Sequence, residues 1–324
     1  MKSLSRWIVP VAFALTAVAT PALAQTVLNV NTALTTDDPM YAGLERMKAN
    51  VEKRSAGKLT IRIYPGSQLG KDEDVLEQAR AGANVAVLVD GGRLAPFVKE
   101  FGIMGAPYLV DNYEQVIKLT SSPLFKGWVG KLRNAANLQV LSFDWFQGHR
   151  HVLTNVAVKV PADLKGIRMR TPGAPVWLET VRAMGATPTG MPWSEVYSAL
   201  QTKVIDGAEA QHPAVFGARL YEVVKVITKT EHIFLITGIV TSRTWFDKLP
   251  ADQQAILSEE SDAAGRWASE KTIESLADYE KKLREKGVSV VEIDKTPFRT
   301  ATAGVYATLG YTDLRVEVNK ALGK

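Results

Sequence analysis

Strand and helix patterns alternate along the first 90 residues, and this alternation restricts the fold more than any other feature of the chain. Residues 27–31, 59–64 and 85–89 have the apolar patterns of strands. Between them, residues 39–51 and 72–81 carry apolar side chains at helical spacing. The order strand, helix, strand, helix, strand predicts a parallel sheet covered by helices.

A second unit of the same kind follows. The expected strands lie at 139–143, 149–154, 164–170, 187–191, 204–209 and 233–241, and the expected helices at 176–184 and 194–201. After Pro250 about 35 residues run without proline and keep an apolar seam as far as Gly287. This stretch predicts a helix of roughly 50 Å at 1.5 Å per residue, long enough to lie across two domains.

The amino terminus has the pattern of a secretory signal. Lys2 and Arg6 precede an apolar stretch at residues 8–18, and the small-residue motif Ala22-Leu23-Ala24 follows it. A retained membrane anchor is the alternative, but the apolar run is shorter than the roughly 20 residues that a spanning helix needs. We therefore expect residues 1–24 to be a signal peptide that is cleaved after Ala24.

The composition excludes several kinds of chemistry. The chain has no cysteine, so disulfides, thiolate nucleophiles and iron–sulfur clusters are excluded. The formal net charge of +5 contains no block of Lys and Arg, which argues against a nucleic acid partner. Glycine-rich phosphate loops and hydrolase motifs are missing as well. His149 and His151 would share a strand face, and they are either metal ligands or ordinary, partly buried histidines.

Two arginines share one face of a predicted strand. In residues 166–172, Ile167 and Met169 point to one side while Arg168 and Arg170 point to the other. An arginine at the end of a strand, just before a turn, can bind a carboxylate through both of its terminal nitrogens. An exposed or ion-paired arginine is the alternative.

Several motifs are shared with one family of transport proteins. They are DLKGIRMR at 163–170, MGATP at 184–188, MPWSEVYSALQT at 191–202, VIDGAE at 204–209, QLG at 68–70 and the segment 101–109. In these motifs the chain resembles the solute receptors of tripartite ATP-independent periplasmic (TRAP) transporters. The similarity extends from about residue 28 into the long C-terminal helix.

The resemblance implies an α/β, two-domain fold like that of periplasmic binding proteins, with a cleft between the domains and the long C-terminal helix spanning both. Expected boundaries are 25–147 plus about 234–274 for domain I, 148–233 plus about 275–305 for domain II, and 306–324 for a C-terminal tail. Such a protein is a periplasmic monomer without enzymatic activity, cofactor or metal, and it delivers a small organic acid to the TRAP membrane carrier. Alternatives are a sensor subunit with the same site and a secreted, metal-assisted hydrolase that uses His149 and His151.

The resemblance also implies a ligand site. Arg170 would be the main carboxylate ligand, with Arg150 assisting, while Trp193 either walls the pocket or packs a helix onto its domain. Ala210 replaces an asparagine that often touches ligand in the family, and Gln211 and His212 are the candidates to supply the missing polar group. Glu73 and Trp177 are weaker candidates that also fit a cap and a core position. The full set of expected ligand-binding residues is Arg170, Arg150, Trp193, Gln211, Glu209, Gln68, Asp90 and Phe216.

One expectation concerns the ligand itself. Because Ala210 replaces the usual asparagine and Arg170 is the one cation that the resemblance places firmly in the pocket, we expect a small monocarboxylate rather than a C4-dicarboxylate. A second carboxylate would have to leave water, which is costly without a cation of its own. Arg150 could still supply that cation.

Overall fold

The computed structural model, which describes residues 26–324, is built on one mixed sheet of nine strands. Its order is β2-β1-β3-β8-β4-β7-β5-β6, with β9 paired to β8. The strands are β1 (Thr26–Asn31), β2 (Leu59–Tyr64), β3 (Val85–Asp90), β4 (Leu138–Thr154), β5 (Arg168–Thr171), β6 (Thr187–Gly190), β7 (Gly207–Ala210), β8 (Val226–Ser242) and β9 (Ser289–Val291). The predicted signal peptide lies outside the described residues.

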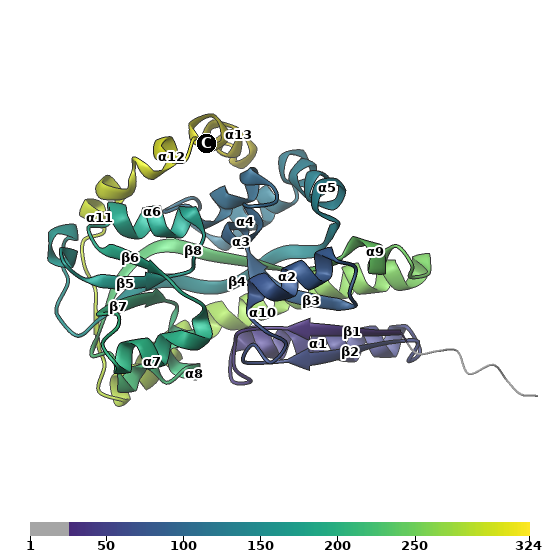
Figure 1. Ribbon diagram of the computed structural model, residues 1–324, viewed down its shortest axis with the longest axis horizontal. Helices are drawn as coiled ribbons and strands as arrows, with labels where there is room; N and C mark the ends of the chain where they lie inside the picture. Colours follow the sequence, from purple (N-terminus) through teal and green to yellow (C-terminus); the bar gives the residue numbers. More distant parts are fainter. Residues whose placement is uncertain (1–25) are drawn as a thin grey trace, which may run out of the picture.

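The helices divide into two groups around this sheet (Figure 1). In the first lobe, strands β1 to β3 are packed with α1 (Pro39–Arg54), α2 (Asp72–Arg80), α3 (Gly91–Leu94), α4 (Tyr113–Thr120) and α5 (Pro123–Ala136). In the second lobe, strands β5 to β7 are packed with α6 (Pro175–Ala183), α7 (Val196–Gln201) and α8 (His212–Gly217). The remaining helices are α9 (Arg243–Phe246), α10 (Ala251–Glu285), α11 (Thr296–Thr302), α12 (Val305–Thr308) and α13 (Thr312–Leu322).

The alternating pattern at the start of the chain predicts the first lobe well. Strands β2, β1 and β3 are parallel, and α1 begins where Asp38 caps it and Pro39 follows. The sheet is not parallel throughout, however, because β3 pairs antiparallel with β8. The parallel sheet expected from the first 90 residues is therefore confirmed for β1 to β3, and the sheet becomes mixed beyond β3.

Two long strands connect the lobes. The segment predicted to form two strands, at 139–143 and 149–154, forms the single strand β4 of 17 residues. Strand β8 also has 17 residues. The two pair antiparallel, with four register shifts between residues 140 and 152 of β4. Such irregularities break the period-two pattern, which explains why β4 reads as two strands. Strand β5 is shorter than predicted, because 161–164 form a 3₁₀ turn. Strand β7 starts later than predicted and β8 earlier.

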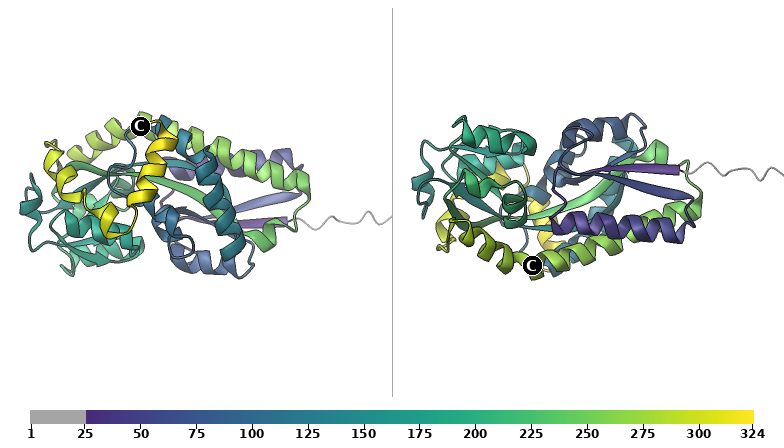
Figure 2. Two further views of the ribbon diagram at one scale, coloured as in Figure 1. Left: turned by 90° about the horizontal axis from the view of Figure 1, so that it is seen from above. Right: turned by 90° about the horizontal axis from the view of Figure 1, so that it is seen from below.

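The long helix predicted after Pro250 is confirmed as α10, which has 35 residues. It packs on α1 and β4 in the first lobe and on α8 and β9 towards the second, and Figure 2 shows it along both lobes. A Cβ at Gly265 would lie 2.5 Å from the indole nitrogen of Trp145, so only glycine permits this close helix–strand contact. Every helix within residues 26–324 is too short or too polar to cross a membrane.

Candidate functional site

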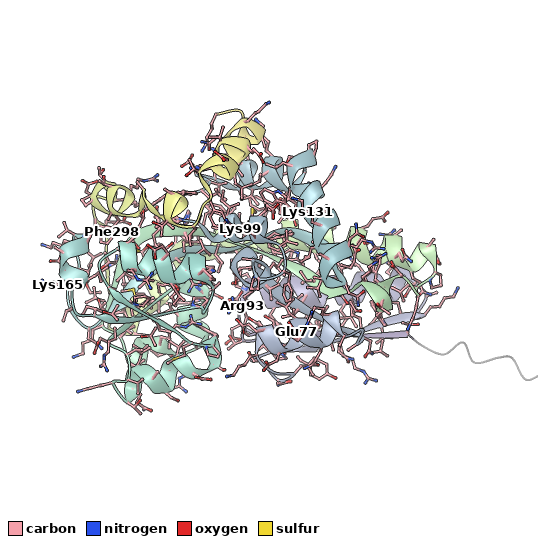
Figure 3. All side chains as sticks on the ribbon, turned by 45° about the horizontal axis from the view of Figure 1, so that its top comes forward. Glu77, Arg93, Lys99, Lys131, Lys165 and Phe298 are labelled. Atoms are coloured by element: carbon pink, nitrogen blue, oxygen red, sulfur yellow. The ribbon has the colours of Figure 1, made fainter. Side chains whose placement is uncertain are left out.

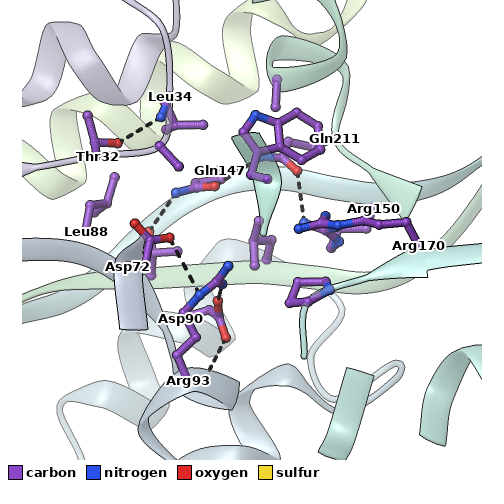
Figure 4. A pocket seen from close by; sticks show the side chains of 16 residues that line it. Thr32, Leu34, Asp72, Leu88, Asp90, Arg93, Gln147, Arg150, Arg170 and Gln211 are labelled. Carbon is purple, nitrogen blue, oxygen red and sulfur yellow. Dashed lines mark hydrogen bonds and ion pairs between the residues drawn. The ribbon is translucent and has the colours of Figure 1, made fainter. Parts of the chain in front are cut away.

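A cavity lies where the two lobes meet, and side chains from both lobes line it (Figure 4). Arg150 and Arg170 approach it from one side, whereas Asp72, Asp90 and Arg93 approach it from the other. Figure 3 shows Arg93 at the junction of the lobes. The lining residues are Thr32, Ala33, Leu34, Asp72, Leu88, Asp90, Arg93, Gln147, Arg150, Arg170, Pro172, Trp193, Gln211, Ala214, Leu235 and Thr237.

Arg170 is a buried cation without an acidic partner among the described residues. It lies near the end of β5 with 1% of its surface exposed, and its Nε and Nη2 donate to the carbonyl oxygen of Met191 at 2.9 and 2.7 Å. Burial and then the charge of Arg150 lower the pKa of Arg170 to about 9. A guanidinium held in this way can bind an anion in the cavity.

Arg168 shows how position along the strand separates the two arginines. It begins β5, is exposed, and pairs with Asp206 at 2.8 Å. Arg170, two residues later on the same face, is buried at the cavity. Of the two arginines, Arg168 therefore has the exposed, ion-paired role that was the alternative to binding a carboxylate.

Arg150, in contrast, is neutralised inside the protein. Its Nε and Nη2 both bind the carboxylate of Glu209, with Nη2 2.6 Å from Oε1, and its Nη1 donates to Gln211 Oε1 at 3.3 Å. Thr171 also donates to Glu209 Oε1, at 2.8 Å. Burial by itself would raise the pKa of Glu209, but the charge and hydrogen bonds of Arg150, together with His232, lower it to about 2. Glu209 thus remains an anion and cancels the charge of Arg150.

The opposite wall carries a cluster of charged groups from the first lobe. Arg93 forms an ion pair with Asp90, another with Glu73 at 2.9 Å, and lies 3.6 Å from Asp72. Burial raises the pKa of Asp72 to about 6, although the charge of Arg93 opposes this. One carboxyl oxygen of Asp72 is buried without a hydrogen-bond partner. This wall therefore offers hydrogen-bond acceptors to a ligand.

Two buried glutamines connect the walls. Gln211 Nε2 donates to Gln147 Oε1 at 3.0 Å, and Gln147 Nε2 lies 3.4 Å from the hydroxyl of Thr237. Gln147 and Thr237 belong to the long strands β4 and β8. The floor of the cavity is thus polar and is built on the strands that join the lobes.

The predicted site residues fall into two sets. Arg170, Arg150, Trp193, Gln211 and Asp90 line the cavity, and Trp193 also packs against two apolar clusters, so it has both of the roles considered for it.

The other candidates lie outside the lining. Glu209 is fully buried behind Arg150, and Gln68 is exposed on the turn before α2. Phe216 packs against Tyr221 and Tyr279. Glu73 pairs with Arg93 beside a neighbouring hollow at the edge of the cavity.

The histidines pack with one another and with aromatic rings. His149 lies against Phe146 and Phe234, whereas the rings of His151 and His212 are 4.5 Å apart. Within residues 26–324, no group of three or more His, Asp or Glu side chains is arranged to hold a metal ion.

Several lining residues were missed by sequence reasoning. Asp72 and Arg93 follow β2 and β3, and Gln147 lies three residues before Arg150. The sequence did carry a signal for Asp72 and Arg93. Ligands bind beyond the carboxyl ends of parallel strands, and β3 ends at Asp90. Nothing in the local pattern of β4 distinguishes Gln147 from a core position.

Comparisons with known proteins identify the family. Residues 30–313 match the model of bacterial extracellular solute-binding proteins, family 7. The C4-dicarboxylate-binding periplasmic protein DctP of Rhodobacter capsulatus is 31% identical over 266 residues, covering 80% of this chain and 79% of that protein. An apo, open structure of a TRAP periplasmic solute-binding protein from Escherichia fergusonii is 44% identical, with a TM-score of 0.80, and covers 91% of this chain and 99% of that one.

A second solved structure is more similar in shape. The TRAP periplasmic solute-binding protein from Ochrobacterium anthropi with bound L-fuconate is 30% identical, covers 92% of this chain and 100% of that one, and has a TM-score of 0.89. The resemblance noted in the sequence is confirmed, and the hydrolase alternative is wrong. The chain belongs to the bacterial extracellular solute-binding proteins of family 7, and it is a TRAP-type transport protein rather than an enzyme.

Proposed function

We propose that this protein is the extracytoplasmic receptor of a TRAP transporter and that it binds a small organic acid through the carboxylate on Arg170. The observation that carries the proposal is the buried guanidinium of Arg170, which has no acidic partner among the described residues. In a closed cleft, charge-assisted bonds from this group to a carboxylate are strong and directional.

The arrangement of the lobes supports a ligand-binding form. The chain superposes better on the L-fuconate complex, at 30% identity, than on the open, apo relative, at 44% identity. A relative with lower sequence identity but better overlap indicates that the lobes lie as in a liganded receptor. We propose that the lobes correspond to the domains expected from the sequence, 25–147 with 234–274 and 148–233 with 275–305.

We further propose that the ligand is a hydroxylated monocarboxylate. Glu209 neutralises the charge of Arg150, and acidic side chains surround Arg93. Among the cations that line the cavity, Arg170 therefore remains to bind the carboxylate of a ligand. Asp72, Asp90 and the two glutamines accept hydrogen bonds, which suits hydroxyl groups. Ala210, on which the sequence argument relied, is buried in β7 outside the lining, so the charge balance is the stronger support.

Known relatives bind both classes of acid. The Rhodobacter capsulatus protein is named for C4-dicarboxylates, whereas solved relatives at 29–30% identity hold L-fuconate, L-galactonate and D-glucuronate. The three sugar acids each carry one carboxylate and several hydroxyl groups, which agrees with the proposed ligand class.

The test is a thermal-shift screen of matched acids. D-glucuronate, L-galactonate, L-fuconate and lactate should raise the unfolding temperature more than succinate, malate and fumarate do. A larger shift with the dicarboxylates would show that Arg150 takes a second carboxylate despite Glu209. Mass spectrometry of the acid retained through native purification would then identify the natural ligand.

We propose that the partner is the TRAP membrane carrier and that the protein is exported to the periplasm as a monomer. A sensor subunit would share every site residue, so the two roles separate only through the membrane partner. Uptake of the identified acid by cells should require both this protein and its carrier. Unchanged uptake in a strain that lacks this protein, with loss of a transcriptional response to the acid, would favour the sensor.

A further inference from the structure

Trp177 does not line the cavity, yet it contacts residues on both of its walls. We propose that Trp177 is a positioning residue that latches the two lobes in the closed form through the hydrogen bond from its indole to Asp90. The inference rests on the proposed function, because it concerns the affinity of the same cavity for its ligand.

The hydrogen bond joins one lobe to the other. Trp177 lies in α6 of the second lobe and is fully buried, and its Nε1 donates to Asp90 Oδ1 at 3.2 Å. Asp90 ends β3 of the first lobe, where the same oxygen also accepts from the backbone N–H of Arg93 at 3.2 Å. The other oxygen of Asp90 is held by the Arg93 guanidinium. The acceptor for the indole is therefore fixed in place.

The ring of Trp177 meets the second charged wall as well. The guanidinium carbon of Arg150 lies 4.7 Å from the centre of the ring, a cation–π distance. Trp177 thus connects Asp90 and Arg150, and both of these side chains line the cavity. A change at Trp177 therefore alters how firmly the two walls are held together, without direct contact with the ligand.

The surface that receives the indole lacks side chains. A Cβ added at Gly92 would lie 2.1 Å from the indole nitrogen, and one at Gly105 would lie 3.2 Å from it. Both glycines belong to the first lobe. A side chain at Gly92 would collide with the indole, so glycine at this position lets Trp177 reach Asp90.

A contact that exists only in the closed form has a characteristic effect on binding. It shifts the equilibrium between the open and closed forms, and therefore changes the affinity for every ligand by the same factor. Trp193 serves as the contrast. It lines the cavity, with its ring centre 5.3 Å from the guanidinium carbon of Arg170, so its contribution to affinity depends on which ligand groups lie against it.

The test compares Trp177→Phe with Trp193→Phe by calorimetry. The probes are those among D-glucuronate, L-galactonate, L-fuconate and succinate that the unaltered protein binds. Trp177→Phe keeps a ring over Arg150 but removes the N–H, and it should weaken each probe by the same factor, on the order of tenfold. Trp193→Phe should weaken the probes by unequal factors. The unfolding temperature of the ligand-free Trp177→Phe protein should not change, since the bond is absent from the open form.

A second variant gives an independent check. Gly92→Ala places a methyl group where the indole docks, and it should weaken the same probes by a uniform factor. Unchanged affinities in both variants, unequal factors for Trp177→Phe, or a lower unfolding temperature of the ligand-free Trp177→Phe protein would overturn the latch. The proposed function is judged separately: full affinity in Arg170→Ala would refute it, whereas loss of binding there with full affinity in Trp177→Phe would refute the latch alone.

Discussion

Replacement of Arg170 by alanine should abolish measurable binding of the organic acid, because the ligand carboxylate would be desolvated without a cation. Loss of one partner of a buried charged pair costs about 2–5 kcal/mol, roughly thirty-fold to several-thousand-fold in affinity. Arg170→Lys should be nearly as harmful, since a point charge cannot replace a planar group with two parallel donors. Calorimetry with the identified acid measures both variants.

Arg168→Ala is the matched control for these variants. Arg168 lies on the same strand but is exposed and paired with Asp206, so its loss should leave the affinity unchanged. The ligand-free Arg170→Ala protein should also remain folded, because the substitution removes a buried charge that forms no ion pair with any residue of 26–324. Wild-type affinity in Arg170→Lys would contradict the bidentate role.

The sequence predicted the individual residues of the site unequally. Arg170 ends one of the shared motifs, and the resemblance also implied Arg150, so a resemblance was enough to find both. The pairing of Arg150 with Glu209 was not predictable, because it depends on which face β4 and β7 present across an antiparallel register. Asp72 and Arg93 follow the carboxyl ends of β2 and β3, where a binding edge could be expected, but which side chains there reach the cavity depends on how the two lobes meet.

Among the elements, α1 has a cap that makes the stability of the protein depend on pH. Asp38 is buried and accepts from the backbone N–H of Met40 at 2.9 Å, and burial raises its pKa to about 7 from the usual 3.8. The folded protein therefore holds this proton more tightly than the unfolded chain. The stability from this group is complete below pH 4 and is lost as the pH rises through 7.

Asp38→Asn should remove this dependence, because asparagine also caps helices and carries no charge. We expect the variant to match the wild type near pH 4 and to exceed its free energy of unfolding at pH 8, on the order of 1–3 kcal/mol. Urea unfolding of both proteins at the two pH values measures the difference. An equal loss of stability at both pH values would instead mean that the cap needs a carboxylate.

The elements themselves were predictable where the patterns are long and local. The helix α10 followed from 35 residues with a continuous seam and no proline, and α1 from its cap and spacing. The long strands β4 and β8 did not follow, because their bulges interrupt the alternation on which strand prediction depends. Their pairing joins residues between 72 (Thr154 and Val226) and 104 (Leu138 and Ser242) positions apart, a separation far longer than the local patterns used for strand prediction.

At the scale of the whole molecule, ligand binding should both close the two lobes and stabilise the folded state. Binding to the folded state alone adds about 2.7 kcal/mol at a hundredfold excess over the dissociation constant. X-ray scattering should show a smaller radius of gyration with ligand than without, and the unfolding temperature should rise in the same samples. Arg170→Ala should show neither change. A radius of gyration that stays constant while the unfolding temperature rises would argue for binding without closure.

The C-terminal helix α13 returns to the first lobe. It packs on α4 and α5, where Lys118 donates to the carbonyl oxygen of Leu322 at 2.8 Å and Lys324 pairs with Asp111 at 2.6 Å. Strand β1, at the beginning of the described chain, belongs to the same lobe. Fluorescent proteins fused to the two ends would therefore move together and report little of the closing motion. A biosensor for the acid needs one fluorophore inserted in the second lobe, for instance in the exposed turn around Val156.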